Sequence, residues 1–175
     1  ADLMRHYVSH EFGNAGSRTH EMGRQAAKAV NKARQQIANL VEAEISDVVF
    51  TSGATESSNL AILGLSSFAK EERKTHIIST STEHKATLEP LERLASQGFE
   101  VELLPVDQKG RVTADQVEKA IRPETFLITV IHGNNETGVL NPVAEIADLL
   151  ESKGEGIFFH VDAAQTFGKV ITPLS

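Results

Sequence analysis

An aspartate at the end of a predicted strand is the residue of this chain best suited to chemistry. The mostly apolar run 157–161 (IFFHV) predicts a buried strand, and Asp162 follows where that strand should end. Ligands of open α/β sheets bind at the carboxyl ends of the strands. A carboxylate there, with the amide of Gln165 one helical turn later, suits a cationic heterocycle with a polar neighbour. Taken alone, such an aspartate is more often the cap of the next helix, so both roles stay open.

A glycine turn that leads into a helix, at residues 51–57 (TSGATES), predicts an anion site. The free N–H groups and the positive end of the helix dipole suit an anion, most naturally a phosphate, and Thr55 adds a hydroxyl. A plain helix cap by Ser52 or Thr55 is an equally weighted alternative. The segment is not a P-loop, because no Lys-Ser or Lys-Thr pair follows the glycine at the required spacing.

Two more polar clusters follow predicted strands. In residues 81–85 (STEHK), His84 is able to stack on a flat ligand or to move a proton near neutral pH. Alternatively, His84 starts a helix, with Glu83 and Lys85 in solvent. Lys85 would be able to form an imine with a carbonyl cofactor, but neighbours on a helix point in different directions, so it is not expected to share the site with His84. The run 132–138 (HGNNETG) predicts either a turn or amides that fix a ligand's oxygen or carboxylate.

The elements that position these clusters alternate between strand and helix, which predicts an α/β fold with a largely parallel sheet covered on both faces. Thr113 is expected to cap a short helix, and the turn at 154–156 to end the last one. Residues 1–17 are expected to be an initial segment, and residues 1–175 a single domain. Strands are predicted at 47–51, 76–79, 99–106, 125–131 and 157–161, and helices at about 17–42, 56–68, 86–96, 113–121 and 142–153.

Composition narrows the possible classes of protein. The 175 residues suffice for one domain with a sizeable core, and 40% hydrophobic and 23% charged residues are ordinary for a globular protein. A net charge of −7 argues against direct nucleic-acid binding, and no membrane span or signal peptide is expected. With no cysteine, a disulfide or a cysteine nucleophile within this chain is excluded, and the cytoplasm is the expected compartment. The seven histidines lack the spacing of a helical metal site, so no metal is expected.

Taken together and in this order, the polar segments resemble the cysteine desulfurases, in the class V aminotransferase group of pyridoxal-phosphate enzymes. The chain departs from that family at Ala15-Gly16, where the family usually has a small residue or proline followed by serine. The matching segments are 13–17 with His20 and Gly23, 51–57 with Asn59, 82–86, 134–136 with Gly138, and 160–163 with Gln165, which together cover nearly the whole chain.

The resemblance implies a three-layer αβα fold of the pyridoxal-phosphate transferase large-domain type, truncated, and a cofactor held at both of its ends. Ala54 and Thr55 would hold the cofactor phosphate. His84 would stack on the pyridine ring and assist proton transfers, which makes it the candidate catalytic residue.

The remaining implied contacts concern the polar atoms of the ring and the substrate. Asp162 would pair with the ring nitrogen and keep it protonated, so that the ring acts as an electron sink. Gln165 would contact the phenolic oxygen of the ring. Asn135 would lie beside that oxygen, near the substrate carboxylate.

The reaction implied by the resemblance is removal of sulfur from L-cysteine, which gives L-alanine and an enzyme persulfide. The lysine that forms the imine and the nucleophilic cysteine would lie beyond Ser175, the cysteine in a smaller C-terminal domain, so this chain alone is expected to be inactive. The expected partners are a second copy in a homodimer and a sulfur acceptor: an iron–sulfur scaffold, a tRNA thiolation relay or a DNA sulfur-modification protein. A selenocysteine lyase, another class V enzyme such as a transaminase, and a non-catalytic cofactor-binding or dimerisation module are the alternatives. The segments 82–85 and 134–136 favour a desulfurase or lyase over a transaminase.

Overall fold

The computed structural model describes residues 2–154 and 156–170, which fall into two compact units that divide after Phe50. The sequence predicted a single domain over residues 1–175, and this stays a prediction, because the two units are described separately. Two residues named in the predictions lie outside the described residues: Glu155, in the turn predicted to end the last helix, and Ser175. Within them, no helix is long and apolar enough to cross a bilayer, and no three His, Asp or Glu side chains gather as metal ligands would.

The first unit is helical and contains α1 (Asp2–Ser9), α2 (Glu21–Leu40) and the short 3₁₀ helix η1 (Ile45–Asp47). The expected initial segment therefore includes a helix, none of whose residues is fully buried. The predicted helix at 17–42 begins four residues late because His20 caps it: the ring Nδ1 accepts a hydrogen bond from the backbone N–H of Gly23 at 3.0 Å.

The strand predicted at 47–51 is wrong. Residues 45–47 form η1, and residues 48–51 have no regular structure. A strand needs a neighbouring strand to satisfy its backbone, and this segment pairs with none in the described part of the chain. The carbonyl of Val48 instead accepts a hydrogen bond from Arg34, whose guanidinium also lies 5.0 Å from the centre of the Phe50 ring.

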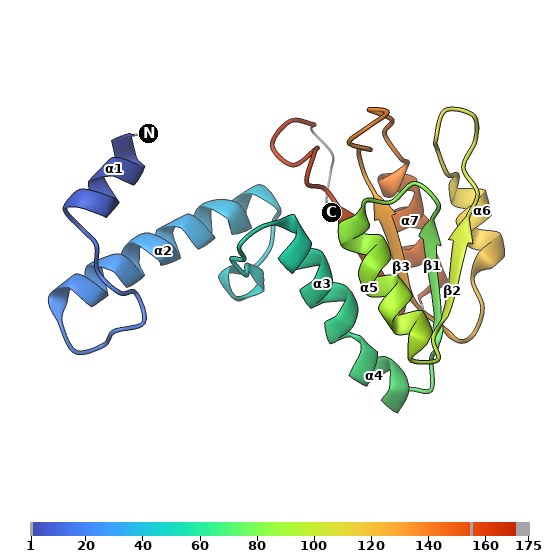
Figure 1. The fold of residues 1–175 in the computed structure, drawn as a ribbon, viewed down its shortest axis with the longest axis horizontal. Helices are drawn as coiled ribbons and strands as arrows, with labels where there is room; N and C mark the ends of the chain where they lie inside the picture. The colour runs from blue at the N-terminus through green and yellow to red at the C-terminus, as the bar shows by residue number, and fades with distance from the viewer. Residues whose placement is uncertain (1, 155, 171–175) are drawn as a thin grey trace. The chain divides into compact units, whose positions relative to one another are not determined.

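The second unit is built on a four-stranded parallel sheet of order β2-β1-β3-β4. This arrangement confirms the α/β fold with a parallel sheet that the alternation of strands and helices predicted (Figure 1). The bounds are α3 (Ala54–Gly64), α4 (Ser66–Glu71), β1 (His76–Thr80), α5 (Lys85–Ser96), β2 (Glu100–Leu104), α6 (Ala114–Ala120), β3 (Thr125–Ile131), α7 (Val143–Lys153) and β4 (Phe158–Asp162).

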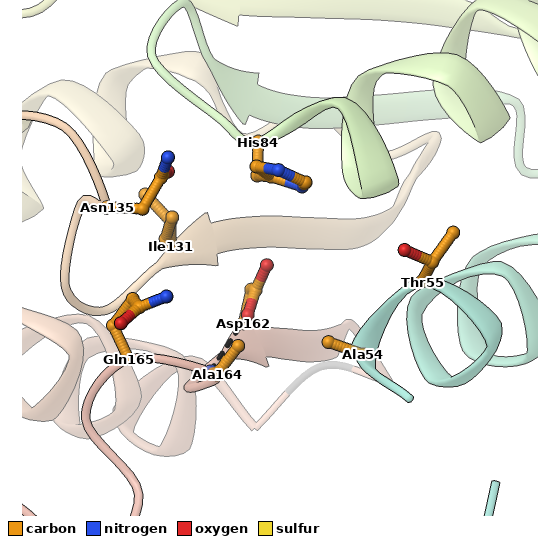
Figure 2. A pocket seen from close by; sticks show the side chains of 8 residues that line it. All are labelled: Ala54, Thr55, His84, Ile131, Asn135, Asp162, Ala164 and Gln165. Atoms are coloured by element: carbon orange, nitrogen blue, oxygen red, sulfur yellow. Dashed lines mark hydrogen bonds between the residues drawn. The ribbon is translucent and has the colours of Figure 1, made fainter. Parts of the chain in front are cut away.

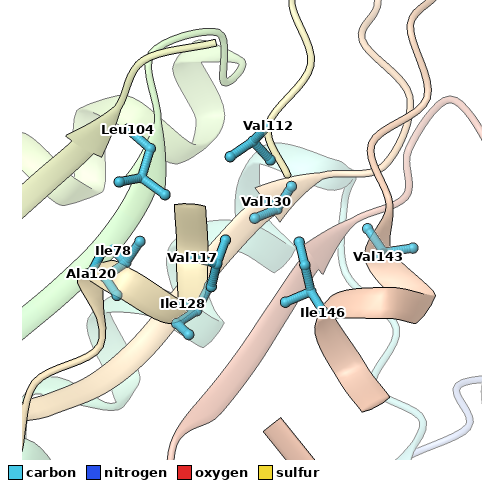
Figure 3. Packing of buried hydrophobic residues seen from close by; sticks show 9 residues of the cluster. All are labelled: Ile78, Leu104, Val112, Val117, Ala120, Ile128, Val130, Val143 and Ile146. Carbon is cyan, nitrogen blue, oxygen red and sulfur yellow. The ribbon is translucent and has the colours of Figure 1, made fainter. Parts of the chain in front are cut away.

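Helices cover both faces of this sheet, so the unit has three layers. On one face α6 and α7 pack against the sheet through an apolar cluster that Figure 3 shows around Ile128 and Val130. On the opposite face α3, α4 and α5 pack through Ile62, Ala69 and Leu91. β3 lies between β1 and β4 and is buried along its whole length, as its apolar run predicted.

Two helix ends in this unit follow the sequence prediction closely. Thr113 caps α6, since its hydroxyl oxygen accepts from the backbone N–H of Gln116 at 3.2 Å while the Gln116 side chain accepts from the N–H of Thr113. Gly154 ends α7 in the left-handed conformation, with φ of 61°. Because all four strands run the same way, their carboxyl ends, and the loops that follow them, share one edge of the sheet.

Candidate active site

A pocket of about 190 Å³ opens at the carboxyl edge of the sheet. The six side chains predicted from the sequence to hold a ligand all line it, although they come from four separate segments (Figure 2). The lining residues are Ala54, Thr55, His84, Ile131, Asn135, Asp162, Ala164 and Gln165. Figure 2 shows Asp162 between the start of α3 on one side and Asn135 and Gln165 on the other, with its carboxylate directed toward His84.

The amino end of α3 reaches the pocket without a cap. Gly53 occupies the N-cap position, and no side chain caps the helix there. Neither candidate cap takes that role, because the backbone N–H and the hydroxyl of Ser52 both donate to Glu56 Oε2, each at 2.6 Å. These hydrogen bonds lower the pKa of Glu56. The positive end of the helix dipole is therefore available to an anion beside Ala54 and Thr55.

His84 caps α5 and also lines the pocket, so it is a helix-start histidine, while its role toward a ligand stays a prediction. Its Nδ1 accepts a hydrogen bond from the backbone N–H of Ala86 at 3.1 Å. In the neutral imidazole this fixes the hydrogen on Nε2, the nitrogen away from the helix. Lys85 is the first residue of α5, is exposed, and is not among the residues that line the pocket.

The two neighbouring asparagines after β3 differ in burial and in the contacts that they make. Asn134 is buried, and its Oδ1 accepts from the backbone N–H groups of Glu136 at 2.9 Å and Thr137 at 2.8 Å, and from the Thr137 hydroxyl at 3.1 Å. It therefore shapes the loop as an Asx turn does. Asn135 is exposed in this loop and lines the pocket. The turn interpretation thus applies to Asn134, whereas ligand binding by Asn135 stays a prediction.

Asp162 is the last residue of β4, lies opposite Ile131 of β3 and is only 6% exposed. Its Oδ1 accepts from the backbone N–H of Ala164 at 3.0 Å, so it stabilises the turn that follows the strand. The helix expected after Asp162 is replaced by this turn, which places the exposed Gln165 at the pocket. Oδ2 of Asp162 receives no hydrogen bond from the residues that the structure describes.

Glu83 is a member of this region that the sequence did not reveal. The alternative that placed Glu83 in solvent is wrong on this point, because the residue is 6% exposed and its carboxyl accepts a hydrogen bond from the backbone N–H of the pocket-lining Ile131. Burial raises the pKa of its carboxyl to about 7, and the charge of Asp162 adds to the increase. No local pattern predicts this burial, since it depends on β3 lying beside β1.

Comparison with known proteins places this chain in a family. The family described as Aminotransferase class-V matches residues 1–173, and the chain belongs to that family. Among curated proteins, it is similar to the cysteine desulfurase IscS of Shewanella frigidimarina (strain NCIMB 400), with 48% identity over 159 residues that cover 91% of this chain and 39% of the relative. It is also similar to the cysteine desulfurase IscS of Dechloromonas aromatica (strain RCB), with 46% identity over 175 residues, 100% of this chain and 43% of the relative.

Solved structures agree with the sequence relatives. DndA from Streptomyces lividans superposes with a TM-score of 0.89 at 48% identity, over 97% of this chain and 46% of that one. SspA in complex with cysteine gives a TM-score of 0.87 at 43% identity, over 95% of this chain and 47% of that one. The resemblance to cysteine desulfurases inferred from the ordered motifs is thereby confirmed. The chain spans about two fifths of the length of the curated relatives it matches.

Proposed function

We propose that this chain forms part of the pyridoxal-phosphate site of a cysteine desulfurase. One observation carries the proposal: the uncapped amino end of α3 and the free carboxylate oxygen of Asp162 line the same pocket. The helix end suits a phosphate, and the carboxylate suits a protonated pyridine nitrogen. The residues present therefore fit the cofactor at both of its charged ends.

On the phosphate side, the backbone N–H groups of Ala54 and Thr55 and the Thr55 hydroxyl would bind the phosphate oxygens. His84 would stack on the ring, and its Nε2 would be the atom that holds or releases a proton, because Nδ1 is occupied by the N–H of Ala86. The same hydrogen bond fixes the orientation of the imidazole at the pocket.

On the opposite side, Asp162 would hold a proton on the ring nitrogen. When bound, pyridoxal phosphate would supply an electron sink for bonds at the α-carbon of an amino-acid substrate. The side-chain amide of Gln165 would donate to the phenolic oxygen of the ring. Asn135 would lie beside that oxygen and orient the substrate carboxylate.

The substrate we propose is L-cysteine, with L-alanine and an enzyme persulfide as products. It is supported by the names of the sequence relatives and by the SspA relative in complex with cysteine. Because this chain has no cysteine, the sulfur-accepting thiol would come from another part of the protein. The lysine that forms the imine would also come from another part, since no lysine is among the described residues that line the pocket. We propose that the protein is a homodimer that transfers sulfur to an acceptor protein of iron–sulfur assembly, tRNA thiolation or DNA sulfur modification. The compartment expected from the sequence is the cytoplasm.

Replacing Asp162 tests the cofactor role. Asp162→Asn keeps an oxygen that accepts from the N–H of Ala164, so the turn is retained while the negative charge is lost. In the full-length protein, we expect the affinity for pyridoxal phosphate to fall at least about tenfold, which corresponds to about 1.4 kcal/mol. Affinity is measured by titrating the cofactor absorbance. Asp148→Asn, at an exposed site on α7, is the matched control.

Two results would contradict the proposal. The first is a cofactor affinity that remains unaltered in both Asp162→Asn and Asp162→Ala. The second concerns the chain of residues 1–175 on its own, mixed with pyridoxal phosphate and L-cysteine. It lacks any cysteine to accept sulfur, so we expect no sustained release of sulfide. Sustained sulfide release from it would mean that the assignment of roles is wrong.

A further inference from the structure

Two buried polar side chains link the loop after β1 to the carboxyl end of β3 and to the loop that follows it. Glu83 Oε1 accepts from the backbone N–H of Ile131 at 2.9 Å. Asn134 Nδ2 donates to the carbonyl of Thr82 at 2.9 Å. Glu83 directly precedes His84, and Asn134 directly precedes Asn135. His84 and Asn135, which line the pocket, are therefore each preceded by a residue whose side chain is hydrogen-bonded across to the other segment.

The Glu83 carboxyl is enclosed on both of its oxygens. Oε1 also accepts from the Thr80 hydroxyl, at 2.7 Å, whereas Oε2 is buried and has no hydrogen-bond partner among the described residues. An ionised carboxylate would leave a charged oxygen without a partner or solvent, which is costly, while a neutral acid avoids most of that cost. The geometry therefore favours the protonated form of Glu83.

The charges around Glu83 also favour its protonated form. Asp162 lies at the end of β4, one strand beyond Ile131, and its charge disfavours a second negative charge nearby. Other titratable groups at this edge include His132 after β3, whose pKa is lowered by burial, the exposed Glu136 in the loop after β3, and the exposed His84 and Lys85 at the start of α5. Of the two buried carboxyl groups at this edge, Glu83 is the one whose surroundings favour the neutral form.

We propose that Glu83 is a positioning residue of the pocket, which as a neutral carboxylic acid fixes His84 and Asn135 relative to each other and leaves Asp162 as the single negative charge at the ring. The inference rests on the proposed function, since it assigns Glu83 to the site that binds pyridoxal phosphate. Among the described residues, no pocket-lining side chain donates a hydrogen bond to the carboxyl oxygens of Glu83, so its effect on the pocket is indirect. It acts through the backbone of Ile131 and through the turn that carries His84.

The test uses three variants of the full-length protein. Glu83→Gln is neutral at every pH and keeps an oxygen for the N–H of Ile131, and Glu83→Ala removes the link. Glu89→Gln changes an exposed glutamate on α5, the helix that follows Glu83, as a control. Thermal midpoints without cofactor and the affinity for pyridoxal phosphate are measured from about pH 5 to about pH 9.

For wild type and Glu89→Gln, we expect the midpoint to fall as pH rises from about 5 to about 7 and then to level off, because the unfolded chain releases this proton near the ordinary pKa of 4.5 and the folded protein releases it near 7. We expect the affinity to fall as the folded Glu83 ionises near pH 7. Glu83→Gln should lose this fall, and Glu83→Ala should bind about tenfold more weakly than Glu83→Gln even near pH 6. In Asp162→Asn, the fall in the midpoint should shift to lower pH, because the variant removes the charge that raises the pKa of Glu83.

Two results would overturn the proposal: a Glu83→Gln midpoint profile parallel to that of wild type, or equal affinities in Glu83→Gln and Glu83→Ala. If the wild type binds no pyridoxal phosphate at any pH, the proposed function fails. The midpoint profiles are measured without cofactor, so they would still decide whether Glu83 is neutral in the folded protein. The two failures are therefore distinguishable.

Discussion

Asn134 and Thr82 are joined by a hydrogen bond from the side-chain amide to the carbonyl at 2.9 Å, across 52 positions of sequence. Asn134→Ala removes this bond and leaves the donors of Glu136 and Thr137 without their acceptor. Each lost hydrogen bond to a buried group costs about 1 kcal/mol, so we expect the free energy of unfolding to fall by about 2–4 kcal/mol. Denaturant unfolding measures the loss.

The same substitution should weaken cofactor binding, although Asn134 does not line the pocket, because Asn135 loses its fixed loop. Asn31→Ala, at an exposed position of α2, is the control and should change stability by less than about 0.5 kcal/mol. A loss in Asn134→Ala no larger than in the control would show that the loop holds its shape without this side chain.

Gly133 is required by a close contact. A Cβ atom there would lie 2.5 Å from Cγ2 of Thr166 and 3.4 Å from Cδ2 of Leu140. Gly133→Ala should therefore cost about 1–3 kcal/mol through overpacking. Thr166→Ser removes the obstructing methyl group and should recover part of the loss in the double variant. Denaturant unfolding of both single variants and the double variant gives the coupling free energy, and simple additivity would contradict the contact.

The cap of α6 offers a test of stability apart from the site. Thr113→Ala removes the acceptor for the N–H of Gln116 and should lower the free energy of unfolding by about 1 kcal/mol. Thr113→Ser keeps the hydroxyl and should stay within a few tenths of a kcal/mol of wild type. Because α6 packs on the sheet away from the pocket, the cofactor affinity should be equal in both variants; a selective loss in Thr113→Ala would refute this separation.

His76 should make the protein sensitive to acid. The ring is buried in β1, with Nδ1 2.8 Å from the Thr125 hydroxyl, and burial first, then the charge of Arg122, lowers its pKa below the ordinary 6.5. The unfolded state therefore takes up a proton before the folded state does, and stability present above about pH 6.5 is lost as pH falls. We expect His76→Gln to lose less of its free energy of unfolding than wild type between about pH 7 and pH 5.

The comparison for His76 is made at each pH against wild type, so the contribution of Glu83, which runs in the opposite direction, cancels. His10→Gln, at an exposed histidine, is the control and should follow the wild-type profile. Equal acid sensitivity in His76→Gln and wild type would assign the effect to another group, such as the half-buried His160, whose pKa burial also lowers.

Local patterns in the sequence predicted much of the second unit. The apolar run of β3 identified a strand that is buried along its whole length. The run at 157–161 also predicted a buried strand, and that burial is wrong: β4 is an edge strand of the described sheet, and its residues before Asp162 are exposed or half-buried. Local patterns placed polar clusters at strand ends and helix starts, and the resemblance to cysteine desulfurases singled out the six pocket residues within those clusters.

What the sequence did not predict depends on contacts between distant segments. Residues 47–51 have the composition of a strand, but strand formation also needs a neighbour, and none lies beside them in the described residues. Glu83 looks like a surface residue until β3 is placed next to β1 and covers it. The predicted helix up to about 68 is two helices that meet at Leu65, so composition alone did not mark that boundary.

The spread of the pocket residues from Ala54 to Gln165 has a consequence for how the protein is made. A chain emerges from the ribosome amino end first, so the start of α3 is available long before β4. Only when β4 pairs with β3 does Asp162 arrive opposite Ile131, and contacts between such distant segments form slowly. A ligand held at both ends of the pocket would therefore have to bind after β4 has paired with β3. Until that pairing, only the start of α3 would be ready to receive an anion.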